Sequence, residues 1–322
     1  MLPVAVDAMG GDHAPGEIVA GARLAADEGI PVLLVGRPEV VASAGLPCIE
    51  ASEVIEMHDD PANGVRRKKD SSLVRAAEAV RDGVASAMVS AGNTGATMAS
   101  ALLRMGRIKG VSRPAIATVL PRPGMHPTVL LDSGANAECQ APWLVQFAQM
   151  GAVYSQHRFG LERPKVGLLS IGEEAGKGND LVKETHDLLT TAPHVHFIGN
   201  VEGRDVLTEA VDVVVTDGFT GNVVLKTLEG ALSAISSSIM QALAATAEFQ
   251  ANQGPLRAAH RQVYDFLDPE TYGGAMLLGV EGVCIISHGS SSALALRNAI
   301  RVAADMVRGA TVEGLRVAIA AE

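Results

Sequence analysis

Four short loops rich in glycine, serine, asparagine and threonine each follow an apolar run and precede a helix-like stretch. Backbone N–H groups are unpaired where a helix begins, and the positive end of the helix dipole lies there, so such loops bind oxyanions. A set of this size predicts one pocket for a phosphate-like group at the carboxyl edge of a parallel sheet. The segments are AMVSAGNTGATMAS (87–100), TVLLDSGANAE (128–138), VVVTDGFTGNVVLK (213–226) and VCIISHGSSSALAL (283–296), with VAVDAMGGDH (4–13) as a related fifth.

Most polar side chains in these loops are uncharged hydrogen-bond donors. Phosphate held by uncharged donors keeps its charge and can attack as a nucleophile, whereas a site full of arginines would blunt that attack. The same donors, with one lysine, can stabilise the oxyanion that forms when an acyl carbonyl is attacked. The alternative is that these residues only shape turns. The donors are Asn93, Thr94, Ser133, Asn136, Asn179, Thr220 and Asn222, joined by Lys177.

The usual motifs for cofactors and metals are missing from the sequence. The strand expected at 4–8 is not followed by G-x-G-x-x-G, and GEEAGKGN (172–179) lacks the spacing and the Ser/Thr of a P-loop. Neither H-E-x-x-H nor C-x-x-C occurs, and we interpret His194 and His196 as ordinary histidines. No Ser-His-Asp or Cys-His pairing is evident. The sequence therefore predicts no cofactor, no metal and no need for an acyl-enzyme.

Composition limits the classes of partner. The net charge of −10 argues against binding to a phosphate backbone, and an aromatic content of 3% argues against base stacking, so no nucleic acid is expected. No apolar run approaches the roughly 20 residues that span a bilayer. Three scattered cysteines, Cys48, Cys139 and Cys284, are typical of reduced thiols. We expect a soluble cytoplasmic protein.

The elements that must position the loops alternate between strands and helices. This alternation predicts an α/β fold in which a mostly parallel sheet is covered on both faces. Strands are expected at 4–8, 32–35, 87–90, 115–120, 128–131, 166–171, 196–198, 211–216 and 283–287. Helices are expected at 15–28, 73–81, 94–104, 142–159, 181–189, 223–249, 255–266 and 293–308.

Three local features complete the expected organisation. The strands at 115–120 and 128–131 form an antiparallel hairpin through PRPGMHP (121–127). The segment 61–72 is a polar loop, in which Ser71 or Ser72 caps the next helix. The chain forms a single domain over 1–322, with a helical excursion from the sheet at about 223–268.

Several segments follow one family's order across nearly the entire chain. They are VDAMGGDHAP (6–15), RRKKDSS (66–72), SAGNTGA (90–96), GRIKGVSRPA (106–115), LLDSGAN (130–136), SIGEE (170–174), KGN (177–179), GNVEGRD (199–205), VTDGFTGNVVLK (215–226), YGGAMLLG (272–279) and HGSS (288–291). In these segments the chain resembles the bacterial phosphate acyltransferases, also called acyl-ACP:phosphate transacylases, of phospholipid synthesis. The resemblance implies a three-layer α/β/α fold, similar to phosphotransacetylases and to isocitrate and isopropylmalate dehydrogenases, and a homodimer.

The resemblance also implies a reaction. A long acyl chain moves from the thioester of acyl carrier protein to inorganic phosphate, and a membrane-bound glycerol-3-phosphate acyltransferase uses the acyl phosphate. A thiol of pKa near 8.5 leaves readily as thiolate, so positioning phosphate and stabilising one oxyanion suffice. The family's helical hairpin near 240–270 is linked with dimer contacts and peripheral membrane attachment. Here it carries Arg257 and Arg261 but no dense lysine run, and its apolar side chains are mostly alanine.

Carried over by motif, the resemblance gives Lys177 and Asn222 as catalytic residues. The phosphate-binding candidates are Asn93, Thr94, Ser133 and Asn136. The candidates that line the pocket floor, or only tie its loops, are Asp7, Asp12 and His13.

A basic cluster formed by Arg66, Arg67, Lys68 and Lys69 is the candidate docking site for the acidic carrier. A second cluster comprises Arg104, Arg107, Lys109 and Arg113, and the alternative for the first is a solvated loop.

Three other functions remain open from the sequence. A phosphotransacetylase would use the same chemistry on a short acyl-CoA. An oxidative decarboxylase would need carboxylates for a metal and arginines for substrate carboxyls, which these loops do not supply. A non-enzymatic scaffold for lipid synthesis would leave the donor loops unexplained.

Overall fold

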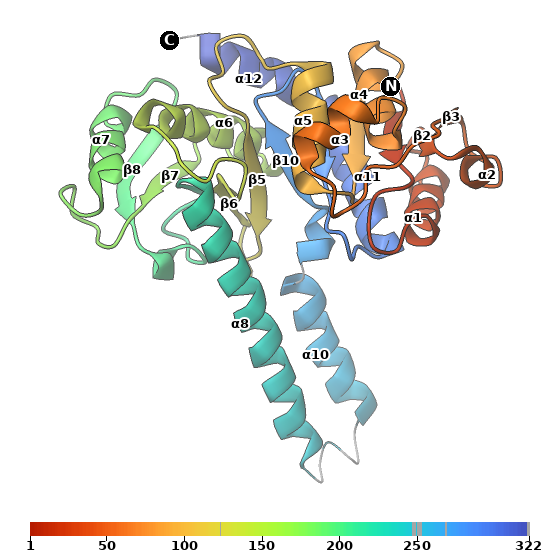
Figure 1. The fold of residues 1–322 in the computed structure, drawn as a ribbon. Helices are drawn as coiled ribbons and strands as arrows, with labels where there is room; N and C mark the ends of the chain where they lie inside the picture. Colours follow the sequence, from red (N-terminus) through yellow and green to blue (C-terminus); the bar gives the residue numbers. More distant parts are fainter. Residues whose placement is uncertain (123, 247–248, 250–252, 268, 321–322) are drawn as a thin grey trace.

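The computed structural model describes residues 1–322 except 123, 247–248, 250–252, 268 and 321–322. Within these residues, eleven strands form one sheet in the order β3-β2-β1-β4-β11-β10-β5-β6-β9-β7-β8 (Figure 1). The strands are β1 (Val4–Asp7), β2 (Val32–Gly36), β3 (Cys48–Glu50), β4 (Ala87–Ser90), β5 (Ala115–Leu120), β6 (Thr128–Leu131), β7 (Lys165–Leu169), β8 (His196–Val201), β9 (Val213–Val215), β10 (Ala275–Leu278) and β11 (Val283–Ile286).

Strand direction reverses in the middle of this sheet. The strands β3, β2, β1, β4 and β11 are parallel to one another, and so are β6, β9, β7 and β8. Between the two groups, β10 is antiparallel to both β11 and β5, and β5 is antiparallel to β6. Three reversals in succession leave the two parallel groups running in opposite directions. Their carboxyl ends therefore face each other. The register places both at the middle of β5, because Met276 of β10 pairs with Ile285 of β11 and with Ala117, and Thr118 pairs with Leu130 of β6.

Helices cover both faces, which confirms the three-layer α/β/α fold (Figure 1). Side chains alternate along each strand, so Val4 and Val6 pack in one core with α1, α6 and α11, while Ala5 packs in another with α4. The helices are α1 (Gly16–Asp27), α2 (Pro38–Val41), α3 (Pro61–Arg67), α4 (Ser72–Arg81), α5 (Thr94–Ser100), α6 (Ala141–Phe159), α7 (Asp180–Leu189), α8 (Gly218–Ala244), α10 (Gln253–Leu267), α11 (Ala293–Arg308) and α12 (Thr311–Ala320), with a π-helical turn at Ala101–Met105 and 3₁₀ turns at Gly203–Asp205 and Pro269–Tyr272.

The expected hairpin and helix cap are both present. Strands β5 and β6 pair antiparallel, with Thr118 opposite Leu130, although residue 123 of the connection lies outside the described part. Ser71 caps α4, because its side chain accepts a hydrogen bond from the Val74 N–H. The prediction of a polar loop at 61–72 is wrong for residues 61–67, which form α3. Asp60 caps a helix there, and Pro61 suits its first turn, so α3 forms despite its polar composition.

Two helices project from the body as an arm, which consists of α8 and α10 (Figure 1). Helix α8 begins at residue 218 rather than 223, because the Asp217 side chain caps it by accepting from the Thr220 N–H. It ends at Ala244, and the expected excursion at 223–268 falls partly on residues outside the described part.

The sequence suggested no span long enough for a membrane, but α8 meets that criterion by length and composition. Its best 18-residue window has a mean hydropathy of 1.3 and is 6% buried. One such helix is weak evidence for a membrane span. This helix also carries Lys226 and Glu229, which form an ion pair at 2.8 Å.

Candidate active site

A cavity of about 760 Å³ brings loops from both parallel groups together. The loops after β1, β4 and β11 form one wall, and the loop after β6 and the first turns of α8 form the other. The floor is the face of the short central strands β5 and β10. The polar end of the cavity is lined by Asp12, Gly92, Thr94, Thr118, Ser133, Gly134, Asn222, Lys226, Ser287, His288, Gly289, Ser290 and Ser291.

The cavity does not lie at a single carboxyl edge, as the sequence led us to expect. The two groups of strands run in opposite directions, and their carboxyl ends face each other at the middle of β5, so their loops approach the cavity from opposite sides. Ile116 and Thr118 of β5, with Ala275 of β10, lie on the floor that the loops flank.

Asp132, fully buried at the end of β6, shapes the loop that follows. Its carboxylate accepts the N–H groups of Gly134, Ala135 and Asn136 at 2.8–3.1 Å. These three amides are therefore committed to the protein and are not free for an oxyanion. The Asn136 side chain donates to Asp132 and to the Pro114 carbonyl, and it does not line the cavity. Ser133 does line it.

Asp7 has a comparable position at the end of β1. It accepts hydrogen bonds from the Ser90 hydroxyl at 2.8 Å and from the Met9 N–H at 3.2 Å, and burial raises the pKa of its carboxyl. It ties two loops together and does not itself line the cavity. Asp12 lines the cavity, and its N–H donates to the Gly289 carbonyl at 2.7 Å. His13 is exposed outside the cavity.

The loop after β4 places one of its two candidates in the cavity. Thr94 lines the wall. Asn93 instead caps α5, where its oxygen accepts from the Ala96 N–H at 3.0 Å and its amide donates to the Met57 carbonyl at 2.9 Å. Its side chain therefore fixes the loop.

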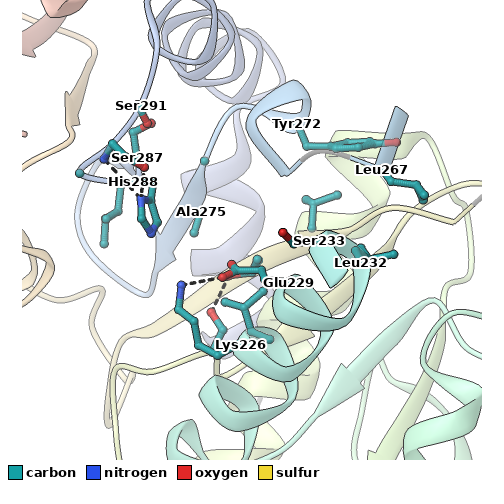
Figure 2. A pocket seen from close by; sticks show the side chains of 18 of the residues that line it. Lys226, Glu229, Leu232, Ser233, Leu267, Tyr272, Ala275, Ser287, His288 and Ser291 are labelled. Carbon is teal, nitrogen blue, oxygen red and sulfur yellow. Dashed lines mark hydrogen bonds and ion pairs between the residues drawn. The ribbon is translucent and has the colours of Figure 1, made fainter. Parts of the chain in front are cut away.

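The two catalytic candidates are not together in this structure. Asn222 lies in the second turn of α8 and lines the cavity. Lys177 lies in the exposed loop between β7 and α7 and does not line it. The lysine that does is Lys226, one helical turn after Asn222, paired with Glu229 (Figure 2). Sequence reasoning missed Lys226, although its i+4 spacing from Asn222 on a predicted helix could have indicated it.

Sequence reasoning also missed the residues that follow β11. The segment was recognised as a donor loop, but none of its side chains was singled out. Ser287, His288 and Ser291 all line the cavity (Figure 2). The Ser287 and Ser291 hydroxyls lie 2.8 Å apart and close this loop on itself.

Beyond the polar end, the cavity continues between the two helices of the arm as an apolar groove. Ser236 and His260 join the helices across it, with 3.0 Å between the Ser236 Oγ and the His260 Nε2. The apolar side chains are Leu225, Leu232, Ile235 and Ile239 of α8 and Val263, Tyr264 and Leu267 of α10. The space is therefore polar at the body and apolar along the arm.

The basic cluster lies at the end of α3, and none of its four residues lines the cavity. Arg66, Arg67 and Lys69 are exposed. Lys68 is half-buried, donates to the Val54 carbonyl at 2.7 Å and pairs with Asp59, whose pKa this hydrogen bond lowers. Three of the four charges are thus available to a partner, and the charge of Lys68 is balanced within the protein. Among the described residues, no group of three or more His, Cys, Asp or Glu side chains is placed to hold a metal ion.

Solved structures with the same fold define the broader class. A phosphotransacetylase from Streptococcus pyogenes superimposes with a TM-score of 0.65 at 17% identity, covering 95% of this chain and 94% of that one. The EutD phosphotransacetylase from Staphylococcus aureus gives 0.61 at 16% identity, covering 95% and 94%. A 4-hydroxythreonine-4-phosphate dehydrogenase from Klebsiella pneumoniae gives 0.57 at 14% identity, covering 95% and 100%. The fold is that of the phosphotransacetylases, as expected.

Sequence comparison narrows the class to one family. Residues 2–313 match the family described as "Fatty acid synthesis protein". The protein named phosphate acyltransferase of Desulfitobacterium hafniense is 48% identical, covering 98% of this chain and 97% of the relative, and that of Heliobacterium modesticaldum is 51% identical, covering 94% and 93%. The chain belongs to the phosphate acyltransferase family and is an enzyme of that type.

The base of α8 is held against the Asp132 loop by a glycine, and this contact is testable. A Cβ on Gly221 would lie 1.9 Å from the Asp132 carbonyl oxygen. We expect Gly221→Ala to lower the free energy of unfolding by about 3 kcal/mol or more, because neither backbone can yield easily. Urea unfolding provides the measurement. Gly230→Ala is the matched control: that glycine has open space around it in the same helix, so alanine should stabilise by about 0.5–1 kcal/mol. A Gly221→Ala variant as stable as wild type would contradict this account.

Proposed function

We propose that the protein moves a long-chain acyl group from the thioester of acyl carrier protein to inorganic phosphate, giving acyl phosphate and free carrier. The relatives support phosphate acyltransfer in lipid synthesis. The observation that carries the proposal is the cavity itself, which joins a polar end lined by hydroxyl and amide donors to an apolar groove. Such a space suits a ligand with an anionic head and a long apolar tail.

The groove is long enough for a fatty acyl chain. From Leu225 to Ile239 the helix rises about 21 Å, at 1.5 Å per residue. A bilayer core of about 30 Å holds two acyl chains end to end, so one chain spans about 15 Å. An acetyl group would leave nearly all of this apolar lining unused. The groove therefore favours a long acyl chain over the short acyl-CoA of the alternative function.

The chemistry needs no enzyme nucleophile. A phosphate oxygen attacks the thioester carbonyl carbon, and the carbonyl π pair moves to its oxygen. Collapse of this oxyanion breaks the C–S bond, and the thiolate leaves with the electron pair. In the proposed arrangement Thr94 and Ser133 bind phosphate, while the Asn222 amide donates to the developing oxyanion. Polar donors fixed before the reaction stabilise such charge without reorganising.

Lys177 is retained as a proposed catalytic residue on the resemblance alone. It lies between Gly176 and Gly178 in an exposed loop, and the surroundings of Gly176 are open. Its ammonium would have to approach the cavity by movement of this loop. Asn93, Asn136, Asp7 and His13 act, in the same proposal, by shaping the loops rather than by touching phosphate.

The proposed partners follow from the reaction. The exposed charges Arg66, Arg67 and Lys69 are the docking surface for the acidic carrier. The product is a lipid-like anhydride, which a membrane-bound glycerol-3-phosphate acyltransferase would consume. We propose that the enzyme is a cytoplasmic homodimer. Peripheral attachment to the membrane would shorten the path of the product to that acyltransferase.

Blocking the groove should separate long-chain from short-chain substrates. Ser233 lies on the lining face of α8, so Ser233→Trp fills the groove. With phosphate, a chelator and palmitoyl carrier protein, wild type should make acyl phosphate and this variant should lose at least about tenfold in kcat/KM, since remote binding energy supports the reaction. Activity with an acetyl thioester should change less than about twofold. The same holds with either substrate for the control Ser238→Trp, because Ser238 is exposed and does not line the cavity. Equal losses on both chain lengths would rule out the acyl groove.

Removing the proposed donors should slow turnover without unfolding the protein. We expect Asn222→Ala and Lys177→Ala each to lower kcat by about 10²-fold, the usual loss for one oxyanion donor. Lys226→Ala should lose less, because Glu229 already pairs with that ammonium. Single-turnover rates provide the comparison. If Lys226→Ala loses more than Lys177→Ala, the catalytic lysine is Lys226.

Reversing exposed charges should affect the carrier more than a small thioester. We expect Arg66→Glu with Lys69→Glu to lower kcat/KM for acyl carrier protein about tenfold at low salt, because rim charges act on association. The difference should shrink at high salt, where the Debye length falls well below about 8 Å. Arg163→Glu with Lys183→Glu makes the same charge change at exposed positions before β7 and on α7. If a small thioester suffers equally, the cluster serves the active site rather than docking.

A further inference from the structure

His288 lies where the polar end of the cavity meets the central strands. It is the second residue after β11 and lines the cavity, and its imidazole is drawn beside Ala275 of β10 (Figure 2). Neither sequence reasoning nor the reaction as proposed above gives it a role. Its neighbours in the loop line the same space, so the ring borders any group held between the two walls.

The hydrogen bonds of the ring fix which nitrogen carries the proton. The Ser290 N–H donates to Nδ1 at 3.3 Å, and the Ser290 hydroxyl lies 2.8 Å from the same nitrogen. A backbone N–H can only donate, so Nδ1 must be the acceptor. In the neutral ring the proton is therefore on Nε2. The free end of the ring is a hydrogen-bond donor.

The loop that carries the ring is fixed at several points. The Asp12 N–H donates to the Gly289 carbonyl at 2.7 Å, which joins this loop to the one after β1. The Ser287 and Ser291 hydroxyls meet at 2.8 Å, and the Ser291 N–H donates to the His288 carbonyl at 3.0 Å. Because these hydrogen bonds fix the loop, the His288 ring keeps its orientation even when no substrate is bound. Preorganisation of this kind is what makes an oxyanion donor effective.

We propose that His288 is a further catalytic residue, whose Nε2–H donates a hydrogen bond to the thioester carbonyl oxygen as that oxygen becomes an oxyanion. This inference rests on the proposed acyl transfer to phosphate. Asn222 donates from the α8 wall and His288 from the β11 wall, so the carbonyl lies between two donors.

The step balances without net proton transfer to the protein. The phosphate oxygen forms the new C–O bond, and the carbonyl oxygen takes the π pair while accepting the hydrogen bonds. When the C–S bond breaks, the thiolate leaves with its electron pair, and the carbonyl re-forms. His288 keeps its Nε2 proton throughout.

The role of the Nε2–H can be tested by replacing His288 with a side chain whose amide mimics only one of the two ring nitrogens. A glutamine amide can place an N–H near the position of Nε2, whereas an asparagine amide reaches only near Nδ1. We expect His288→Ala and His288→Asn to lower kcat with palmitoyl carrier protein by about 10²-fold. His288→Gln should recover at least about tenfold over His288→Ala. The KM for phosphate should change less than threefold in all variants, and His196→Ala on the edge strand β8 should behave as wild type.

Several outcomes would overturn the inference. If wild type makes acyl phosphate and His288→Ala retains a third of its kcat, His288 is not catalytic while the proposed function stands. If wild type makes none with any thioester, the proposed function fails and this inference with it. Equal activity of the Asn and Gln variants would show that the ring only supports the loop.

A spectroscopic measurement tests the ring independently of turnover. In protein labelled with ¹⁵N-histidine, the signals of His288 are those absent from the His288→Gln variant. In the neutral ring these signals should show a proton on Nε2 and none on Nδ1. A proton on Nδ1 would contradict the proposal.

Discussion

The reversal of strand direction at the centre of the sheet is the constraint on which the site depends. A wholly parallel sheet would gather all its loops at one edge. Here β10 is antiparallel to both neighbours and β5 is antiparallel to β6, so the carboxyl ends of the two groups of strands face each other near the middle of the sheet. The cavity therefore has two walls of independent origin, one from each group.

Buried carboxylates hold each wall in shape. Asp7 and Asp132 end comparable strands, and each accepts the N–H or O–H groups of the loop beside it. A buried carboxylate needs such donors, because an unpaired charge in the core is unfavourable. The donors so used are lost to a ligand, and the side chains of Thr94 and Asn222 remain at the surface of the cavity. Ser133 also lines the cavity, but its hydroxyl donates to the Ile116 carbonyl at 3.0 Å. The loop amides thus fix the shape of the cavity walls, and side chains are left to contact a ligand.

The layers and most of the strands and helices could be predicted from the sequence, because its apolar segments form the buried strands and the buried faces of the helices. It missed β10 because four apolar residues between Gly274 and Gly279 do not reveal a strand, still less its direction. That one omission hid the reversal and thus the two-walled cavity. Composition also could not separate loop-shaping from ligand-facing residues: Asn93 and Asn222 are the same amino acid, but Asn93 caps α5 and Asn222 faces the cavity. The partners of each side chain depend on contacts from distant strands.

Helix α8 runs unbroken from Asn222 at the polar end to Ile239 in the apolar groove (Figure 1). Its lining residues share one face, so both ends of the cavity depend on a single angular register. A residue inserted between them would rotate everything beyond it by about 100°, turning the apolar lining away from α10 while leaving the polar end in place. Within this stretch, changes in chain length among relatives should therefore be confined to steps close to whole helical turns. The length of the arm can therefore change only by about three or four residues at a time.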